Sequence, residues 1–311
     1  MSVENTAPPG LFSRMLDSDI WHSFKQSKIT VVAAVVTFLI LFAALFAPLI
    51  APQNPFDPAS LSLLDSYLPP IWQEGSDSRY LLGTDDQGRG ILSTLMYGSR
   101  ISLAVGFASV VFAAILGISL GLLAGYAGGR TDAIIMRIAD IQLTFPSILI
   151  ALLIDGSVRS ALGGINREDS AFYILVFSIG LSFWVQYART VRSSALVEKN
   201  KEYVQAARLI GLHPLKIMAR HVLPNVMGPV LVIATINLAL AIILEATLSF
   251  LGVGMPPTQP SLGTMIGTGN NFLFSGEWWM IFFPGLLLAI LALAVNLLGD
   301  WLRDALNPRL R

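Results

Sequence analysis

Six stretches of this 311-residue chain are apolar over about the 20 residues that an α-helix needs to cross a lipid bilayer. Hydrophobic residues make up 54% of the chain and charged residues only 13%, against about 25% charged residues in a soluble domain. This deficit of charge indicates that much of the surface faces lipid. We therefore expect an all-α membrane protein with six transmembrane helices. The predicted spans cover residues 29–50, 101–126, 133–154, 172–187, 227–251 and 280–298.

The lysines and arginines orient these spans, because cytoplasmic loops carry an excess of them. With both termini in the cytoplasm, 15 of the 20 lysines and arginines lie inside. We therefore predict a multi-pass protein with both termini cytoplasmic. Residues 1–28 form a cytoplasmic segment and 29–50 the first span. Residues 51–100 face outward, and residues 101–311 form a five-helix core that includes a cytoplasmic loop at 197–224.

Composition and motifs argue against several classes of function. The formal net charge is zero, so no nucleic-acid-binding surface is indicated. The chain has no cysteine, and its three histidines have no carboxylate at ligand spacing, so we predict no disulfide and no metal site. Neither GxxxxGK[ST] nor HExxH occurs. We therefore predict that this chain has no catalytic residues, binds no cofactor and is not an enzyme.

A stripe of glycines runs along one face of the second predicted span. Gly117, Gly121 and Gly125 recur every four residues, which places them on one face of a helix. Two interpretations are open. Glycine is common in membrane helices, so the spacing has an ordinary explanation. Alternatively the stripe is a packing seam, within this subunit or with a partner, at which a second helix backbone approaches closely.

Glu245 is the deepest acidic residue in the predicted spans. It lies about 27 Å along the fifth span at a rise of about 1.5 Å per residue, close to the outer interface. A carboxylate within the membrane is costly and is a candidate for function. Near an interface that cost falls, so we favour a structural partner for Glu245, with a gating role as the alternative.

The loop at residues 197–224 is too polar to lie in lipid and carries signals for two short helices. Residues 201–210 favour a helix, and Gly211 sits where a helix C-terminal glycine would. Pro214 fits the first turn of a second helix, which Pro224 would end before the fifth span. We predict a helix–glycine–helix elbow at this place.

The first helix of this elbow has an apolar face through Val204, Ala207 and Ile210. The small residues Ala206 and Ala207 would let its surface sit closely in a groove. Two interpretations remain open from these residues alone. One is an amphipathic helix on the membrane surface, and the other is a docking elbow for a cytoplasmic partner.

The elbow resembles the EAA loop of ABC-importer permeases at Ala206, Ala207, Gly211, Leu223 and Pro224. In that family the loop is a coupling helix that sits in a cleft of the ATPase subunit. The resemblance therefore implies that this loop couples the chain to an ATPase.

Two positions of the elbow differ from that pattern. Gln205 stands where the family has glutamate, and His221 stands where it usually has isoleucine. Glu202 lies one turn before Gln205, and we hypothesise that it supplies the negative charge instead.

Other stretches resemble, in order, the dipeptide/oligopeptide permease C family. They are residues 82–89 (LGTDDQGR), 97–103 (YGSRISL), 124–129 (AGYAGG), 248–254 (LSFLGVG) and 296–304 (NLLGDWLRD). One departure is Gly90, where that family commonly has aspartate. Asp85 and Arg89 in the first stretch become, with Glu245, the candidates for outer-face or gating residues.

The resemblance implies a type I ABC-importer permease of a bacterial inner membrane that moves peptides. The expected partners are a second permease in a heterodimer, two cytoplasmic ATPase subunits that bind ATP and Mg²⁺, and a periplasmic or lipid-anchored substrate-binding protein. Permeases of this type for nickel or for a sugar-like or opine-like solute are alternatives. A stand-alone secondary transporter is the alternative from a different class, and a membrane-anchored enzyme ranks last.

Overall fold

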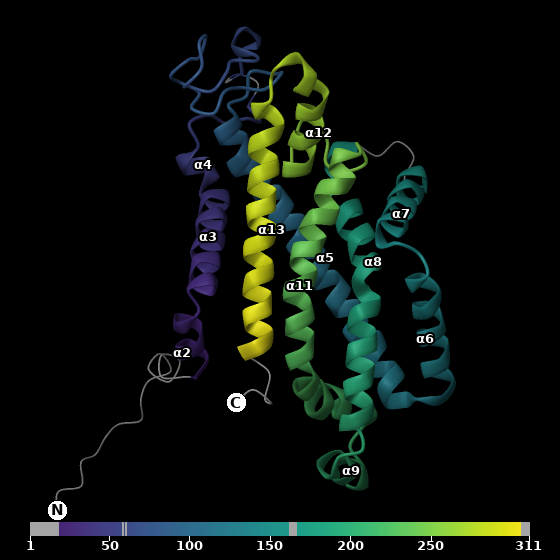
Figure 1. Ribbon diagram of the computed structural model, residues 1–311. Coiled ribbons are helices and arrows are strands. Elements are labelled where there is room, and N and C mark those ends of the chain that lie inside the picture. The colour runs from purple at the N-terminus through teal and green to yellow at the C-terminus, as the bar shows by residue number, and fades with distance from the viewer. Residues whose placement is uncertain (1–18, 58, 60, 162–166, 306–311) are drawn as a thin grey trace, which may run out of the picture.

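The computed structural model describes residues 19–57, 59, 61–161 and 167–305, which form a bundle of long helices (Figure 1). Residues 1–18 of the predicted cytoplasmic segment and residues 306–311 of the predicted core lie outside the described residues. No β-strand occurs in the described ranges.

The elements follow one another along the chain in a simple order. The helices are α2 (Asp19–Gln26), α3 (Lys28–Leu45), α4 (Ala47–Ile50), α5 (Ile91–Ala127), α6 (Gly129–Leu143), α7 (Ser147–Ala161), α8 (Arg167–Glu198), α9 (Glu202–Leu209), α10 (Pro214–Ile217), α11 (Leu223–Phe250), α12 (Leu262–Phe272) and α13 (Trp279–Ala305). The 3-10 turns η2 (Leu63–Asp65) and η4 (Leu273–Ser275) and the π-helical turn η3 (Met218–Val222) complete the set.

Five helices could each cross a membrane, and a bent pair of helices provides a sixth candidate span. The helices α3, α5, α8, α11 and α13 are each long and apolar enough to cross a bilayer. The helices α6 and α7 meet the same test only as a pair, and they are bent by 100° at their junction. Pro146 lies in this junction, where it lacks an N–H and disfavours helix at Phe145. The prediction of an all-α protein with six spans is confirmed, but the third span is not the single helix predicted over 133–154.

Two predicted helix boundaries are wrong because polar residues were assigned to loops. The helix α5 begins ten residues before position 101, so residues 91–100 are helical. Two of its early hydroxyl groups bond back along the chain, since Thr94 Oγ1 donates to Gly90 O at 3.0 Å and Ser99 Oγ to Leu95 O at 2.7 Å. The helix α8 likewise extends beyond the predicted range 172–187 at both ends.

The glycine stripe lies against α8 in the same chain. A Cβ atom at Gly117 would lie 2.4 Å from Trp184 O, and one at Gly121 would lie 2.5 Å from Ala188 O. A Cβ atom at Gly125 would lie 2.8 Å from the Cβ atom of Ala195. No side chain fits in these gaps, so the backbones of α5 and α8 meet directly.

Residues 117–121 also match the letters of the GxSxG nucleophile elbow, which escaped the sequence analysis. That motif requires a sharp turn between a strand and a helix. Here it lies within α5, and Ser119 Oγ donates to Ile115 O at 2.7 Å one turn earlier. The match is one of letters only.

A short helix that the sequence analysis did not predict, α12, lies at the end of the bundle far from α9, next to the start of α13 (Figure 1). Glycines let it pack closely on both neighbours. A Cβ atom at Gly263 would lie 2.3 Å from Ala246 O of α11, and one at Gly269 would lie 2.5 Å from the carbonyl carbon of Met280 in α13. The segment between α11 and α13 is therefore a packed part of the fold.

We expect Gly121→Ala to lower the stability of the folded chain by about 1–3 kcal/mol, because the added methyl group forces two packed backbones apart. The measurement is thermal unfolding in detergent. The matched control is Gly285→Ala, in α13, where a Cβ atom meets no atom within 4 Å. Equal melting temperatures for the two variants would contradict the close approach of α5 and α8.

Candidate functional site

The predicted elbow is present at the end of the bundle that also holds α2 and the last turns of α13 (Figure 1). The helix α9 is closed by Gly211, whose φ of 78° lies in the left-handed region that glycine adopts without steric cost. Leu212 N donates to Ala207 O at 3.1 Å and Gly211 N to Arg208 O at 3.0 Å, the hydrogen-bond pattern of a Schellman motif. The second helix, α10, starts at Pro214 as predicted.

The second short helix does not end before the fifth span. It continues through the π-helical turn η3 into α11, which begins at Leu223 with Pro224 in its first turn. A proline lacks one N–H, and a π-helical turn widens the helix by one residue. The expectation that Pro224 separates the two helices is therefore wrong.

The inner face of the elbow packs on the bundle. Val204, Ala207 and Ile217 are 0%, 4% and 1% exposed and belong to the main apolar core. The prediction that Ala207 and Ile210 share one face is wrong, because Ile210 is 76% exposed. Ile210 has left the helical path, with φ of −80° and ψ of 5° just before the glycine turn. Ala207 thus packs inward and leaves Ala206 as the exposed alanine of the pair.

The outer face of the elbow carries large apolar side chains. Leu209, Ile210 and Leu215 are 88%, 76% and 64% exposed, and we call this group the apolar tip. Glu202 and Gln205 are exposed on the same helix. Clustered apolar side chains on a polar, solvent-facing loop mark an interaction surface.

Tyr203 braces the elbow on the base of α11. Its hydroxyl group donates to the Glu198 carboxylate and accepts a hydrogen bond from Asn225 Nδ2 at 3.0 Å. Asn225 Nδ2 also donates to His221 O at 2.7 Å. Burial, and then the bond to Glu198, raise the pKa of Tyr203 to about 12. The phenol therefore keeps its proton, and can donate it to Glu198, at any neutral pH.

Two cations join the elbow to the end of α5. Lys199 Nζ donates to Gly125 O at 2.7 Å, where the last carbonyl groups of a helix attract positive charge. The Arg208 guanidinium lies 4.8 Å from the ring centroid of Tyr126, within the range of a cation–π contact. A movement of the elbow would therefore be transmitted to α5 through these two contacts.

Gln205 has a role that a carboxylate could not fill. Its Nε2 donates to Asn200 O at 3.0 Å and so closes the turn between α8 and α9. A glutamate at this position has no proton to donate at neutral pH. Glu202 lies in the first turn of α9, where a negative charge is favourable for the helix dipole.

At the opposite end of the bundle, Asp85 and Arg89 form a buried ion pair. They are 5% and 3% exposed, and Arg89 Nε lies 2.5 Å from Asp85 Oδ2. Arg89 Nη1 then donates to Pro257 O at 2.8 Å. Pro257 belongs to the segment between α11 and α12, residues 251–261, which we call the α11–α12 loop.

A second Asp–Arg pair that the sequence analysis missed holds the same loop. Arg159 Nε in α7 lies 2.6 Å from Asp155 Oδ2, and Arg159 Nη2 donates to Val253 O at 2.6 Å. The signal was the spacing, since both pairs are an aspartate followed four residues later by an arginine. We call the two pairs the loop clamps.

Glu245 lies beneath this loop and is fully buried. Its Oε1 accepts a hydrogen bond from Ser249 Oγ at 2.7 Å, and Ser249 Oγ in turn accepts one from Met255 N at 3.1 Å. Glu245 Oε2 has no hydrogen-bond partner among the described residues. The three residues link α11 to its own following loop.

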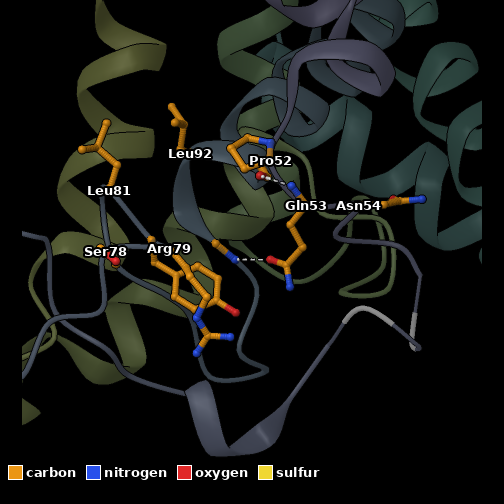
Figure 2. A pocket seen from close by; sticks show the side chains of 11 residues that line it. Pro52, Gln53, Asn54, Ser78, Arg79, Leu81 and Leu92 are labelled. Carbon is orange, nitrogen blue, oxygen red and sulfur yellow. Dashed lines mark hydrogen bonds between the residues drawn. The ribbon is translucent and has the colours of Figure 1, made fainter.

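A cavity of about 730 Å³ lies where the segment after α4 meets the start of α5 (Figure 2). Gln53 crosses it, accepting a hydrogen bond from Gly90 N at 2.8 Å and donating through its own N to Ser93 Oγ at 3.1 Å. Arg79 on its rim pairs with Asp65 and Asp77. Hydrogen bonds from Arg79 hold the pKa of Asp77 below its ordinary value.

Within the described residues, no group of three or more His, Asp or Glu side chains could hold a metal ion.

This fold, a helical membrane bundle with an exposed elbow between two spans, belongs to a known class. The chain belongs to the family of binding-protein-dependent transport system inner membrane components, whose model matches residues 117–311. Residues 17–70 match the N-terminal transmembrane domain of oligopeptide transport permease C.

Relatives with peptide-transport names are similar over most of their length. The chain is 43% identical to the dipeptide transport system permease protein DppC of Escherichia coli, covering 94% of this chain and 93% of that one. It is 38% identical to DppC of Haemophilus influenzae, with 94% and 95% covered. It is 41% identical to the di/tripeptide permease DppC of Pseudomonas aeruginosa, with 83% and 81% covered.

A solved structure shares the fold. The match is to the MetNI methionine ABC transporter in an inward-facing conformation, with a TM-score of 0.53 and 21% identity. It covers 69% of this chain and 96% of that one.

We expect Tyr203→Phe to speed amide hydrogen exchange across residues 199–211, because the brace to Glu198 and Asn225 is lost. The pKa of Tyr203 is higher in the folded protein than in the unfolded chain. The protonated phenol therefore stabilises the fold below pH 10, and this stabilisation is lost as the pH rises toward 12. The protection factor of the wild type, which is the intrinsic exchange rate divided by the observed rate at the same pH, should therefore stay constant up to about pH 10 and fall above it. Tyr173→Phe, at a tyrosine that is 72% exposed, is the control. Unchanged exchange in Tyr203→Phe would contradict the stabilising role of the Tyr203 hydrogen bonds.

We expect Arg89→Met to destabilise the fold by about 3–5 kcal/mol, because it leaves the buried Asp85 carboxylate without a counter-charge. Arg79→Met removes an arginine that is 60% exposed and should cost about 0–1 kcal/mol. Thermal unfolding in detergent compares the two. Adding Asp85→Asn to Arg89→Met should restore part of the loss, and a double variant no more stable than Arg89→Met would contradict this account.

Proposed function

We propose that this chain is a permease subunit of an ATP-driven importer that moves di- or oligopeptides across the cytoplasmic membrane of a bacterium. The family is that of inner membrane components, and the named relatives are dipeptide or di/tripeptide permeases that match the chain almost end to end. The permease C match over residues 17–70 supports the same class of cargo.

The single observation that carries the coupling mechanism is the apolar tip of the elbow. Leu209, Ile210 and Leu215 are exposed apolar side chains on a loop that is fixed to three spans. Such a surface suits the cleft of a partner protein. In this proposal the partner is an ATPase subunit, which binds ATP and Mg²⁺, and the elbow and both chain ends lie in the cytoplasm, as the distribution of lysine and arginine favours.

The contacts of the elbow suggest how movement reaches the pore. The base of the elbow is tied to α5 through Lys199, to α8 through Glu198 and to α11 through Asn225. A push on the tip would move the ends of these helices together. The full importer would contain this chain, a second permease, two ATPase subunits and a substrate-binding protein, periplasmic or lipid-anchored, that delivers the peptide.

We expect Leu209→Arg to weaken binding of the ATPase subunits by about thirtyfold, the effect of losing an interface residue worth about 2 kcal/mol. The measurement is co-purification of the ATPase with the permease, together with ATP-dependent peptide uptake in proteoliposomes. The matched control is Leu64→Arg, since Leu64 is 95% exposed in the segment at the other end of the bundle.

Wild-type retention of the ATPase by Leu209→Arg would overturn the docking role of the elbow. Peptide uptake by this chain in vesicles without ATPase subunits would overturn the whole proposal and favour a secondary transporter.

A further inference from the structure

A second cavity of about 730 Å³ lies between the α11–α12 loop and α12, far from the elbow. Its floor and one wall are the end of α11 and the loop as far as Pro257, and its other wall is α12 as far as Asn271. The volume falls within the range of about 300–1,000 Å³ that small-molecule sites occupy.

The loop wall of the cavity is held in place from several sides. The loop clamps bind it through the carbonyl groups of Val253 and Pro257. Met255 between them is bound at both backbone groups, since its N donates to Ser249 Oγ and its O accepts from Thr264 Oγ1 at 3.2 Å. A wall fixed before the ligand arrives lowers the entropy cost of binding.

The lining of the cavity mixes polar and apolar residues and carries no charge. None of its described lining residues is Asp, Glu, Lys or Arg. Asn270 and Asn271 are exposed on α12, and neither amide group has a hydrogen-bond partner among the described residues. Each amide offers one carbonyl acceptor and two N–H donors. A peptide backbone offers the complementary N–H and C=O groups at every residue.

We propose that this cavity is a subsite for the backbone of the peptide cargo at the outer entrance of the permease, an inference that rests on the proposed function. The Asn270 and Asn271 amides bind the peptide units. The uncharged lining leaves acidic and basic side chains of the cargo without preference, as a route for peptides of varied sequence requires.

The test introduces a charge at the cavity wall and reads the preference for charged peptides. The complete importer, with its binding protein and ATPases, is reconstituted with Asn271→Asp or Asn271→Lys, and uptake of Ala-Lys and Ala-Glu is measured. A unit charge at about 4 Å in water changes the binding free energy by about 1 kcal/mol, or about fivefold. Because the charge attracts one peptide and repels the other, the uptake ratio of Ala-Lys to Ala-Glu should rise about thirtyfold with Asp and fall about thirtyfold with Lys.

The matched control puts the same charges into the cavity of Figure 2, which has a similar volume. Ser78 is exposed and lines that cavity, so Ser78→Asp and Ser78→Lys should leave the ratio at the wild-type value.

An unchanged uptake ratio in the Asn271 variants would overturn the subsite, and so would an equal change in the Ser78 variants. Neither result would affect the proposed function as long as the wild type takes up the peptides. Failure of the wild type to take up either peptide would overturn both. A photoreactive residue at position 271 should label a bound peptide, and labelling of the second permease instead would make this surface a subunit interface and overturn the subsite.

Discussion

The direct backbone contact between α5 and α8 is the constraint on which the other features of the structure depend. It exists because Gly117, Gly121 and Gly125 have no side chain where α8 passes. In the membrane no hydrophobic effect drives helices together, so close packing of this kind must hold them. The seam connects both functional ends, since α8 leads into the elbow and α5 begins directly after the Asp85–Arg89 turn.

The two ends of the bundle differ in the kind of contact that stabilises them. The elbow exposes apolar side chains and is held by bonds from Tyr203, Asn225 and Lys199, so its tip is available while its base is fixed. At the far end the charges are turned inward. Two Asp–Arg pairs offset the cost of burying ions and direct the remaining guanidinium donors to backbone carbonyl groups of one loop.

Much of the fold could be predicted from the sequence because the bilayer imposes a length and a composition on each span. The elbow was equally accessible, since Gly211 and Pro214 carry turn signals that act locally. One error was local, since Pro146 breaks the third span where a single helix was predicted. Another depended on distant residues, because α12 packs between α11 and α13 through glycines whose neighbours are far away in the chain.

The sequence by itself determined the class of protein, the number of membrane segments and the place of the elbow, because apolar length, charge placement and turn residues are local properties. Only the tertiary structure decided which residues of these segments face outward. It turned Ala207 inward and Ile210 outward, gave Gln205 a backbone partner and brought Arg89 and Arg159 to one loop. The two arginine contacts join residues 168 and 94 positions apart, which no local pattern encodes.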